Sequence, residues 1–207
     1  MSPRRDVSTQ RRTQILEAAL KVFARKGFSN ARTDDIAQEA GISKGLLYWY
    51  FESKDAIIRS LLGWLFEADL QLLEALVAQR QRSARERLLE IARQALGSLP
   101  ALKPLMPVAY EFYALASRPG PVREALQNHY RRYCNLLTEL IRQGTQAGEW
   151  QTDAPQNIAL AWLAQFEGLL WLWTLLPNEV NLEAMWMPLA HRLLATLASA
   201  REEKPTQ

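Results

Sequence analysis

The segment 33–54, TDDIAQEAGISKGLLYWYFESK, constrains this chain most, because it predicts two short helices joined by a tight turn. Thr33 is a good N-cap, and the two acidic residues that follow it suit the positive end of a helix dipole. Gly41 suits the left-handed backbone position that ends a helix, and Ser43 caps a second helix beginning at Lys44. Two helices joined by a short turn that contains Gly are typical of a helix-turn-helix. The segment therefore predicts a DNA-binding module.

The second of these helices carries four consecutive aromatic residues, 48–51. No single face of a helix can bury all four, so some of the rings must face outward. Tyrosine hydroxyls beside Lys44 and Lys54 are suitable donors to phosphate oxygens. This composition predicts an exposed surface that fits a DNA groove.

The lead-in ILEAALKVFARKGF (15–28) and the segment 33–58 together resemble the DNA-binding domain of TetR-family transcriptional regulators, almost position by position. The remainder of the chain is similar only in its helical character. The resemblance implies an all-α fold. It also implies a three-helix helix-turn-helix domain in residues 1–55 and a larger helical domain for effector binding and dimerisation in residues 56–207.

The same resemblance assigns roles on the DNA side. Lys44, Gly45 and Leu46 would open the recognition helix toward base edges. Leu46 departs from the family pattern, in which a polar residue is common, but its side chain suits contact with a thymine methyl group. Contacts with the phosphate backbone are implied for Thr33, Tyr48, Tyr50 and Lys54.

The positive charge of the chain is concentrated at its N-terminal end. Residues 1–60 hold eleven Lys and Arg against seven Asp and Glu, a net +4, whereas the whole chain carries +3. Four of these arginines could follow a phosphate backbone or enter a minor groove. They are Arg4, Arg5, Arg11 and Arg12. The alternative for Arg4 and Arg5 is a solvated tail.

Composition limits the cellular setting. A 48% hydrophobic content over 207 residues is ample for a core, and the lone Cys134 excludes an intrachain disulfide. The start, MSPRRDVSTQRRTQ, is polar and basic and lacks the apolar segment of a secretory signal. We therefore expect a cytoplasmic protein.

Hydrophobic periodicity predicts helices and gives no strand pattern. Gly27 closes the first helix, and Ser53 caps a long helix that extends through Leu76. Ser83 and Glu86 form a capping box for a helix to about residue 99. Further expected features are breaks at Pro100, Pro104 and Pro107, a short helix at 108–116, a long amphipathic helix at 126–141, and caps at Asp153 and Asn181 for the last two helices.

The segment 158–176 is nearly apolar and approaches the length of a membrane span. Gln165 and Glu167 lie at its centre, where an acidic residue in lipid costs roughly 2.5–3.5 kcal/mol. Packing against the rest of the chain on one side and a second copy on the other explains it better. With the apolar last helix it predicts a four-helix homodimer interface, and a two-fold dimer would read a palindromic operator.

The rest of the chain is rich in aromatic residues, whose simplest roles are core and interface packing. The other interpretation is an effector cavity, which is mostly apolar with a few polar groups. Glu111 and Glu167 are the candidate polar groups; each could anchor a cationic ligand, or bond a helix end or an Arg across the dimer. The aromatic candidates are Trp64, Phe66, Tyr110, Tyr113, Tyr133, Trp162 and Phe166.

Catalysis has little support in the sequence, because His129 and His191 are far apart and Cys134 suits a small buried position. No metal-ligand cluster or phosphate-binding loop is present, so no cofactor or metal is expected. We predict a non-enzymatic, ligand-responsive regulator of transcription. Its expected partners are double-stranded DNA and a small hydrophobic or aromatic effector that releases a repressor from its operator. The alternatives are a helical carrier or enzyme with an aromatic cavity, and a membrane-associated helical protein.

Overall fold

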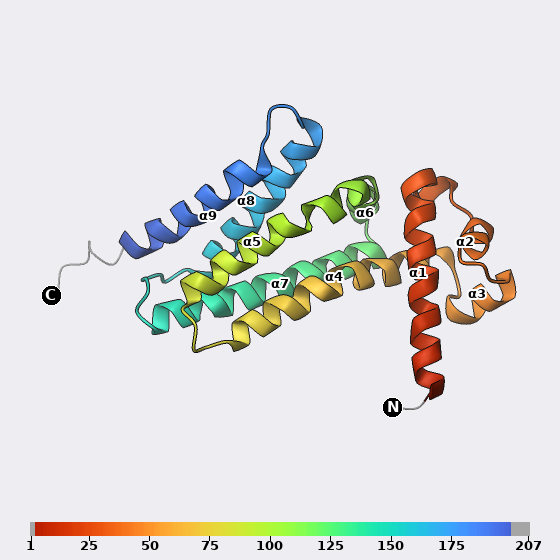
Figure 1. The fold of residues 1–207 in the computed structure, drawn as a ribbon, viewed down its shortest axis with the longest axis horizontal. Helices are drawn as coiled ribbons and strands as arrows, with labels where there is room; N and C mark the ends of the chain where they lie inside the picture. The colour runs from red at the N-terminus through yellow and green to blue at the C-terminus, as the bar shows by residue number, and fades with distance from the viewer. Residues whose placement is uncertain (1–2, 200–207) are drawn as a thin grey trace. The chain divides into compact units, whose positions relative to one another are not determined.

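The computed structural model describes residues 3–199, with side-chain surroundings from residue 7 to residue 197. The regular structure of that part is helical, without strands, which confirms the predicted all-α class (Figure 1). The helices are α1 (Pro3–Asn30), α2 (Thr33–Glu39), α3 (Lys44–Tyr50), α4 (Lys54–Ala78), α5 (Ala84–Leu102), the 3₁₀ turn η1 (Lys103–Leu105), α6 (Met106–Ala116), α7 (Pro121–Gln146), α8 (Pro155–Leu175) and α9 (Leu182–Ser199).

The two glycines expected to end helices both have left-handed backbones. Gly27 interrupts α1 with φ 73°, and Gly41 follows α2 with φ 64°. Ser43 caps α3 as predicted, since its hydroxyl accepts from the N–H of Leu46 at 3.2 Å. The predicted N-cap at Thr33 is wrong by one residue: Arg32 is the N-cap of α2, and its N–H donates to the Asp35 carboxylate at 3.0 Å. The hydroxyl of Thr33 is thereby left for other contacts.

Three further caps are confirmed. The side-chain oxygens of Ser53, Ser83 and Asn181 each accept from the backbone N–H three residues later. The predicted cap at Asp153 is wrong, because the N-cap of α8 is Ala154 and makes no side-chain cap bond. Pro100 does not break the chain either: it lies inside α5, two residues before the end at Leu102, and its missing N–H removes one backbone hydrogen bond of the last turn.

The chain forms two compact units that are not consecutive in sequence. One comprises the chain up to Ala68 together with Pro104–His129, and the other comprises Asp69–Lys103 and the chain from Tyr130 onward. The predicted division at residue 55 separates a DNA-binding part from an effector-binding and dimerisation part, and it stays a prediction.

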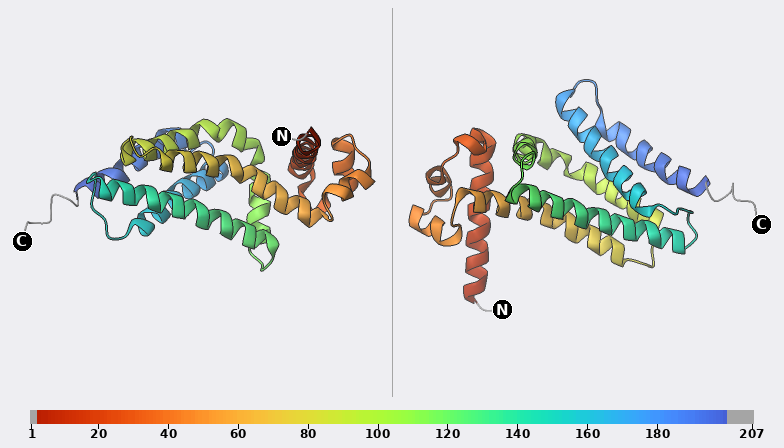
Figure 2. Two further views of the ribbon diagram at one scale, coloured as in Figure 1. Left: turned by 90° about the horizontal axis from the view of Figure 1, so that it is seen from below. Right: turned by 180° about the vertical axis from the view of Figure 1, so that it is seen from behind.

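In the first unit, α1 packs against both α2 and α6. Both views of Figure 2 show α2 and α3 along the same side of α1. Ile15, Val22, Ile36 and Leu47 are fully buried there, with a side-chain exposure of 0%. Leu47 is the one buried residue of α3, which packs against α2, and the other residues of this helix remain at least partly exposed.

Two fully buried tryptophans, Trp150 and Trp186, lie in the core of the second unit. The indole N–H of Trp150 donates to the carbonyl of Ile141 at 3.0 Å, and a side chain larger than hydrogen at Gly144 would overlap the Trp150 ring. The indole N–H of Trp186 in α9 donates to the carbonyl of Ala92 in α5 at 3.2 Å. Each ring thus fills the core while its one donor is satisfied.

Arg87 in α5 is a buried charge that the periodicity did not indicate, with 2% exposure. Its guanidinium donates to the carbonyls of Leu76 and Val77 at the end of α4, and to the Gln143 side chain at 2.7 Å. Burial lowers the pKa of this guanidinium. Arg87 therefore caps α4 and joins α4, α5 and α7 within the second unit.

The apolar helix α8 buries only part of its surface. Leu160 is 57% exposed and Trp171 is 46% exposed, although Ala159, Trp162 and Leu169 are buried. Among the described residues, α8 is the one helix whose length and composition would allow it to cross a membrane. An exposed apolar face on a helix that is otherwise packed into a protein core is typical of an interface with another protein.

Candidate nucleic-acid interface and effector residues

The exposed residues of α3 form one surface, which we call the reading surface: Lys44, Gly45, Leu46, Tyr48 and Trp49. Trp49 is 72% exposed, and Tyr48 and Leu46 are 44% and 38% exposed. Exposing large apolar side chains on a seven-residue helix is unfavourable in water unless they have a partner. Three of the four aromatic residues of the run remain at least partly exposed, as expected, and only Phe51 is buried.

Lys44 at the start of α3 is paired with Asp34 of α2. The ammonium lies 2.7 Å from the carboxylate, and both side chains are more than half exposed. The hydrogen bond with Asp34 raises the pKa of Lys44, so the lysine is charged at neutral pH. An exposed pair of this kind is held weakly, and a phosphate or a guanine edge can replace Asp34 as the partner.

Thr33 and Tyr48, two of the residues with an implied phosphate contact, lie together. Their hydroxyl oxygens are 3.2 Å apart, and the bond joins the first turn of α2 to α3. Tyr50 is half-buried, with its ring edge-on to Trp49 at 4.6 Å between centroids. The backbone-contact roles of these residues stay predictions; Tyr48 lies four residues after Lys44, one turn along the same face of α3.

Lys54 and Arg12 have partners inside the domain. The Lys54 ammonium donates to the backbone carbonyls of Phe28 and Ala31 at 2.7 and 3.1 Å. The Arg12 guanidinium donates to the Ser60 hydroxyl at 2.8 Å and lies 4.4 Å above the Phe51 ring. Both cations therefore help to hold the domain together, whatever contact they also make with DNA.

Of the other three arginines in the predicted basic arm, the structure describes the side chain of Arg11. Arg11 donates to Gln14 at 2.8 Å and is half-exposed on α1. The side chains of Arg4 and Arg5 lie outside the described residues.

The predicted effector residues fall into both compact units. In the first unit, Phe66 is stacked on His129 with 3.8 Å between ring centroids, and Tyr113 is 39% exposed. Glu111 accepts a hydrogen bond from the backbone N–H of Phe28 near the end of α1, and its role toward an effector stays a prediction. Trp64 and Tyr110 are half-buried.

In the second unit, Trp162 and Phe166 both contact Trp186, at 5.2 and 5.1 Å between ring centroids. Trp162 is 3% exposed, so core packing, the simpler of the two interpretations, accounts for it. Glu167 accepts from the Tyr130 hydroxyl at 3.2 Å. Burial, with the nearby carboxylates as a smaller cause, strongly raises the pKa of Tyr133, which therefore stays neutral at physiological pH.

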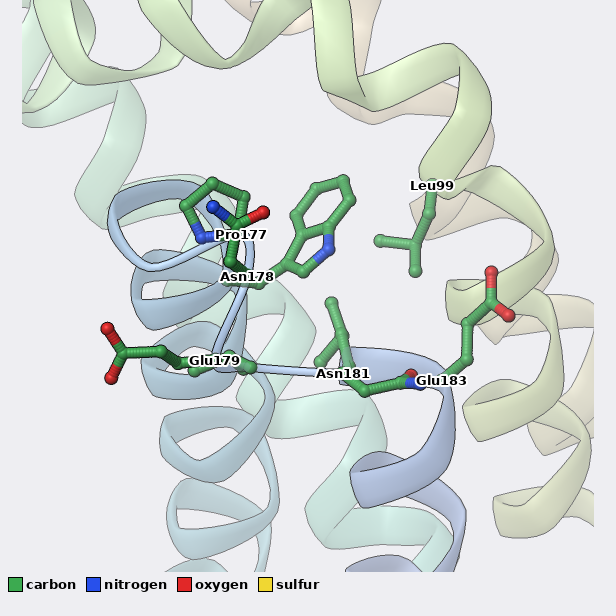
Figure 3. A pocket seen from close by; sticks show the side chains of 9 residues that line it. Leu99, Pro177, Asn178, Glu179, Asn181 and Glu183 are labelled. Carbon is green, nitrogen blue, oxygen red and sulfur yellow. The ribbon is translucent and has the colours of Figure 1, made fainter.

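A hollow of about 330 Å³ lies between α5 and the loop from α8 to α9 (Figure 3). Leu99 stands on one side of it and Pro177 and Asn178 on the other, while Glu179 points away. Trp173 also lines it, and the Lys103 ammonium lies 5.5 Å from the centre of that ring. None of the predicted effector residues lines this hollow.

A helix-turn-helix with an exposed recognition helix, carried by an otherwise helical chain, defines a DNA-binding regulator. Comparison with known families agrees: residues 15–61 match the family described as bacterial regulatory proteins of the tetR family. Residues 84–199 match the C-terminal domain described as that of BetI-type transcriptional repressors. The chain belongs to the TetR family and is a ligand-responsive regulator of transcription.

Individual relatives are distant but span most of the chain. The HTH-type transcriptional regulator YfiR of Bacillus subtilis is 29% identical over 170 residues, 80% of each protein. A solved regulator from Pseudomonas aeruginosa PAO1 superposes with a TM-score of 0.81 at 23% identity, covering 99% of this chain and 96% of that one. A solved complex of SmeT with triclosan gives a TM-score of 0.75 at 20% identity and covers 96% of each chain.

Proposed function

We propose that this protein is a cytoplasmic homodimeric repressor that binds a palindromic operator and leaves it when a small hydrophobic or aromatic effector binds. The observation that carries the DNA-binding part is the reading surface. Its Lys44, Tyr48 and Trp49 side chains are exposed on a helix whose Leu47 is fully buried, so the helix is fixed while its contact groups remain available. Residues 1–55 serve this part, and residues 56–207 serve effector binding and dimerisation.

The exposed apolar face of α8 supports a second copy of this chain as the partner in the dimer. Leu160, Trp171 and Leu175 are each 46% exposed or more, and all lie on α8. Burying such a face contributes roughly 25 cal/mol for each Å² of apolar surface removed from water. A two-fold axis through this face would pair two reading surfaces, as a palindrome requires.

The effector class rests on the chemistry of the predicted residues and on one relative. Aromatic side chains dominate the set, and the relative SmeT is described in complex with triclosan, a hydrophobic compound. Two carboxylates are the candidate polar anchors: Glu111, which accepts from the backbone N–H of Phe28, and Glu167, which accepts from the Tyr130 hydroxyl.

Tryptophan fluorescence and DNA binding measured in one titration test this proposal. Adding triclosan and related hydrophobic compounds should quench the protein's fluorescence and release operator DNA over the same concentration range. Phe166→Ala should weaken both effects together, and Glu124→Ala, an exposed change in α7 outside the predicted effector and dimer residues, is the control. A ligand shifts the equilibrium only through its different affinities for the two states. Quenching that leaves operator affinity unchanged would contradict effector-driven release.

A further inference from the structure

The end of α1 after Gly27, together with the two residues that join α1 to α2 (residues 28–32, here called the turn), is held through its backbone by two other helices. Glu111 of α6 accepts the hydrogen bond from the N–H of Phe28. Lys54, the first residue of α4, donates to the carbonyl of the same Phe28 and to that of Ala31. A single residue of the turn is thus bound on its N–H by a carboxylate and on its carbonyl by an ammonium. Bonds to charged groups are the stronger kind of protein hydrogen bond.

The helix α6 also holds the side chain of Phe28. The Phe28 ring packs edge-on against Phe112 with 5.0 Å between centroids, and against Phe23 with 4.7 Å. Phe112 follows Glu111 directly in the sequence, so α6 holds the ring and the backbone of Phe28 with adjacent residues. Removing the Glu111 carboxylate would therefore leave the aromatic contact, and with it the fold of this unit, in place.

Gly27 makes the approach of Glu111 possible. Its backbone has φ 73°, and a Cβ atom at this position would lie 2.5 Å from Oε1 of Glu111. Any side chain here would both strain the backbone and displace the carboxylate. An open hollow of about 600 Å³ runs along the same turn, with Gly27 and Glu111 on its wall. Side-chain packing covers the turn only in part, which leaves the polar contacts to define its path.

The turn matters because α2 and α3 begin immediately after it. A change at Phe28 alters the direction in which the chain leaves α1, and so the pose of the reading surface. Base recognition requires side chains to meet base edges with hydrogen-bond geometry, whereas nonspecific binding depends mainly on charge. A group that fixes the turn should therefore affect specific binding much more than nonspecific binding.

We propose that Glu111 is a positioning residue for operator recognition: through the backbone of Phe28, its carboxylate sets the pose of α2 and α3 and makes that pose depend on α6. This inference rests on the proposed DNA-binding function and adds a means of regulation to it. A shift of α6 that withdraws the carboxylate frees the N–H of the turn. Specific DNA binding then falls, while the charge that supports nonspecific binding changes little.

The test compares specific with nonspecific DNA binding in the full-length protein. The specific DNA is the sequence that the wild-type protein enriches from a random pool, and the nonspecific DNA is a scrambled duplex of the same length. Glu111→Ala should lower the specific affinity roughly tenfold, the effect of losing one charge-assisted hydrogen bond, and change the nonspecific affinity less than about twofold. Glu111→Gln keeps an acceptor for Phe28 and should stay within about threefold of the wild type. Leu115→Ala, an exposed change on the same helix, is the control and should alter neither affinity.

The outcomes separate this inference from the function on which it rests. A wild-type protein that enriches no sequence contradicts the proposed function itself. If the wild type selects a sequence and a folded Glu111→Ala binds it equally well, the positioning role is refuted. If Glu111→Ala does not fold, Glu111→Asp decides, since its shorter side chain withdraws the carboxylate from Phe28 without straining the backbone: a selective loss of specific binding supports the role, and wild-type binding overturns it.

Discussion

The pairing of Lys44 with Asp34 leads to a prediction about the salt dependence of DNA binding. The two charged groups are 2.7 Å apart in the absence of DNA and are both exposed. On DNA, Lys44 must exchange Asp34 for a phosphate or a base, and Asp34 remains as a negative charge beside the phosphates. Asp34→Asn should therefore strengthen binding to all sequences, whereas Lys44→Ala should weaken binding and relax base preference.

The magnitude follows from counterion release. Each neutralised phosphate contributes about 0.9 to the slope of log affinity against log salt concentration. Losing one contact in Lys44→Ala should make that slope shallower by about 0.9. The ratio of wild-type affinity to Lys44→Ala affinity should therefore fall roughly 3.5-fold between 50 and 200 mM salt. Asp34→Asn should leave the slope equal to or steeper than that of the wild type.

Fluorescence anisotropy of a labelled duplex, measured at four or more salt concentrations, gives these slopes directly. The double variant Asp34→Asn, Lys44→Ala is the control: the part of the gain that comes from releasing Lys44 should disappear, and the part that comes from removing repulsion between Asp34 and the phosphates should remain. Equal slopes for the wild type and Lys44→Ala, with both proteins folded, would refute the assignment of Lys44 to the DNA contact.

Three more predictions concern stability and assembly. Arg87→Ala should lower the free energy of unfolding by about 2 to 4 kcal/mol in urea denaturation, because buried carbonyls lose their donor; no loss would contradict the capping role. The pKa of Tyr133 is raised above its ordinary value of 10.0, so the folded state holds the hydroxyl proton more tightly than the unfolded state does. The stability that this group contributes is therefore lost as pH rises above about 10. Tyr133→Phe should therefore flatten the fall in stability above that pH, and an unchanged pH profile would refute this. Trp171→Glu should convert a wild-type dimer to monomers in sedimentation equilibrium without unfolding it; a wild-type protein that is already monomeric at micromolar concentration would contradict the interface.

The helix-turn-helix was readable from sequence because its signals are local. Gly41 needs a left-handed backbone and Ser43 has the side chain of an N-cap, and both do what their residue types predict. The one-residue error at Thr33 has a local cause as well: Asp35 satisfies the N–H of Arg32, so the cap falls one residue earlier. Residue type therefore fixed this region to within one position.

The contacts that hold the domain together were not readable in this way, because they join residues far apart in the chain. Lys54 suits a phosphate contact by its position in the motif, yet its ammonium donates to two carbonyls of the turn after α1. Glu111 was a candidate ligand group or helix-end partner, but nothing in the sequence named its hydrogen-bond partner Phe28, which lies 83 residues earlier in the chain. The burial of Arg87 was not predicted, because a single arginine in an amphipathic helix is usually exposed. Such pairings depend on the packing of helices, which periodicity alone does not specify.

Selection of duplex DNA from a random pool by the purified protein tests the central claim most directly. The account predicts enrichment of a palindrome with two half-sites, bound by two copies of the chain, with a base preference that relaxes in Lys44→Ala. Enrichment of no sequence, or of a single half-site bound by one copy, would contradict it.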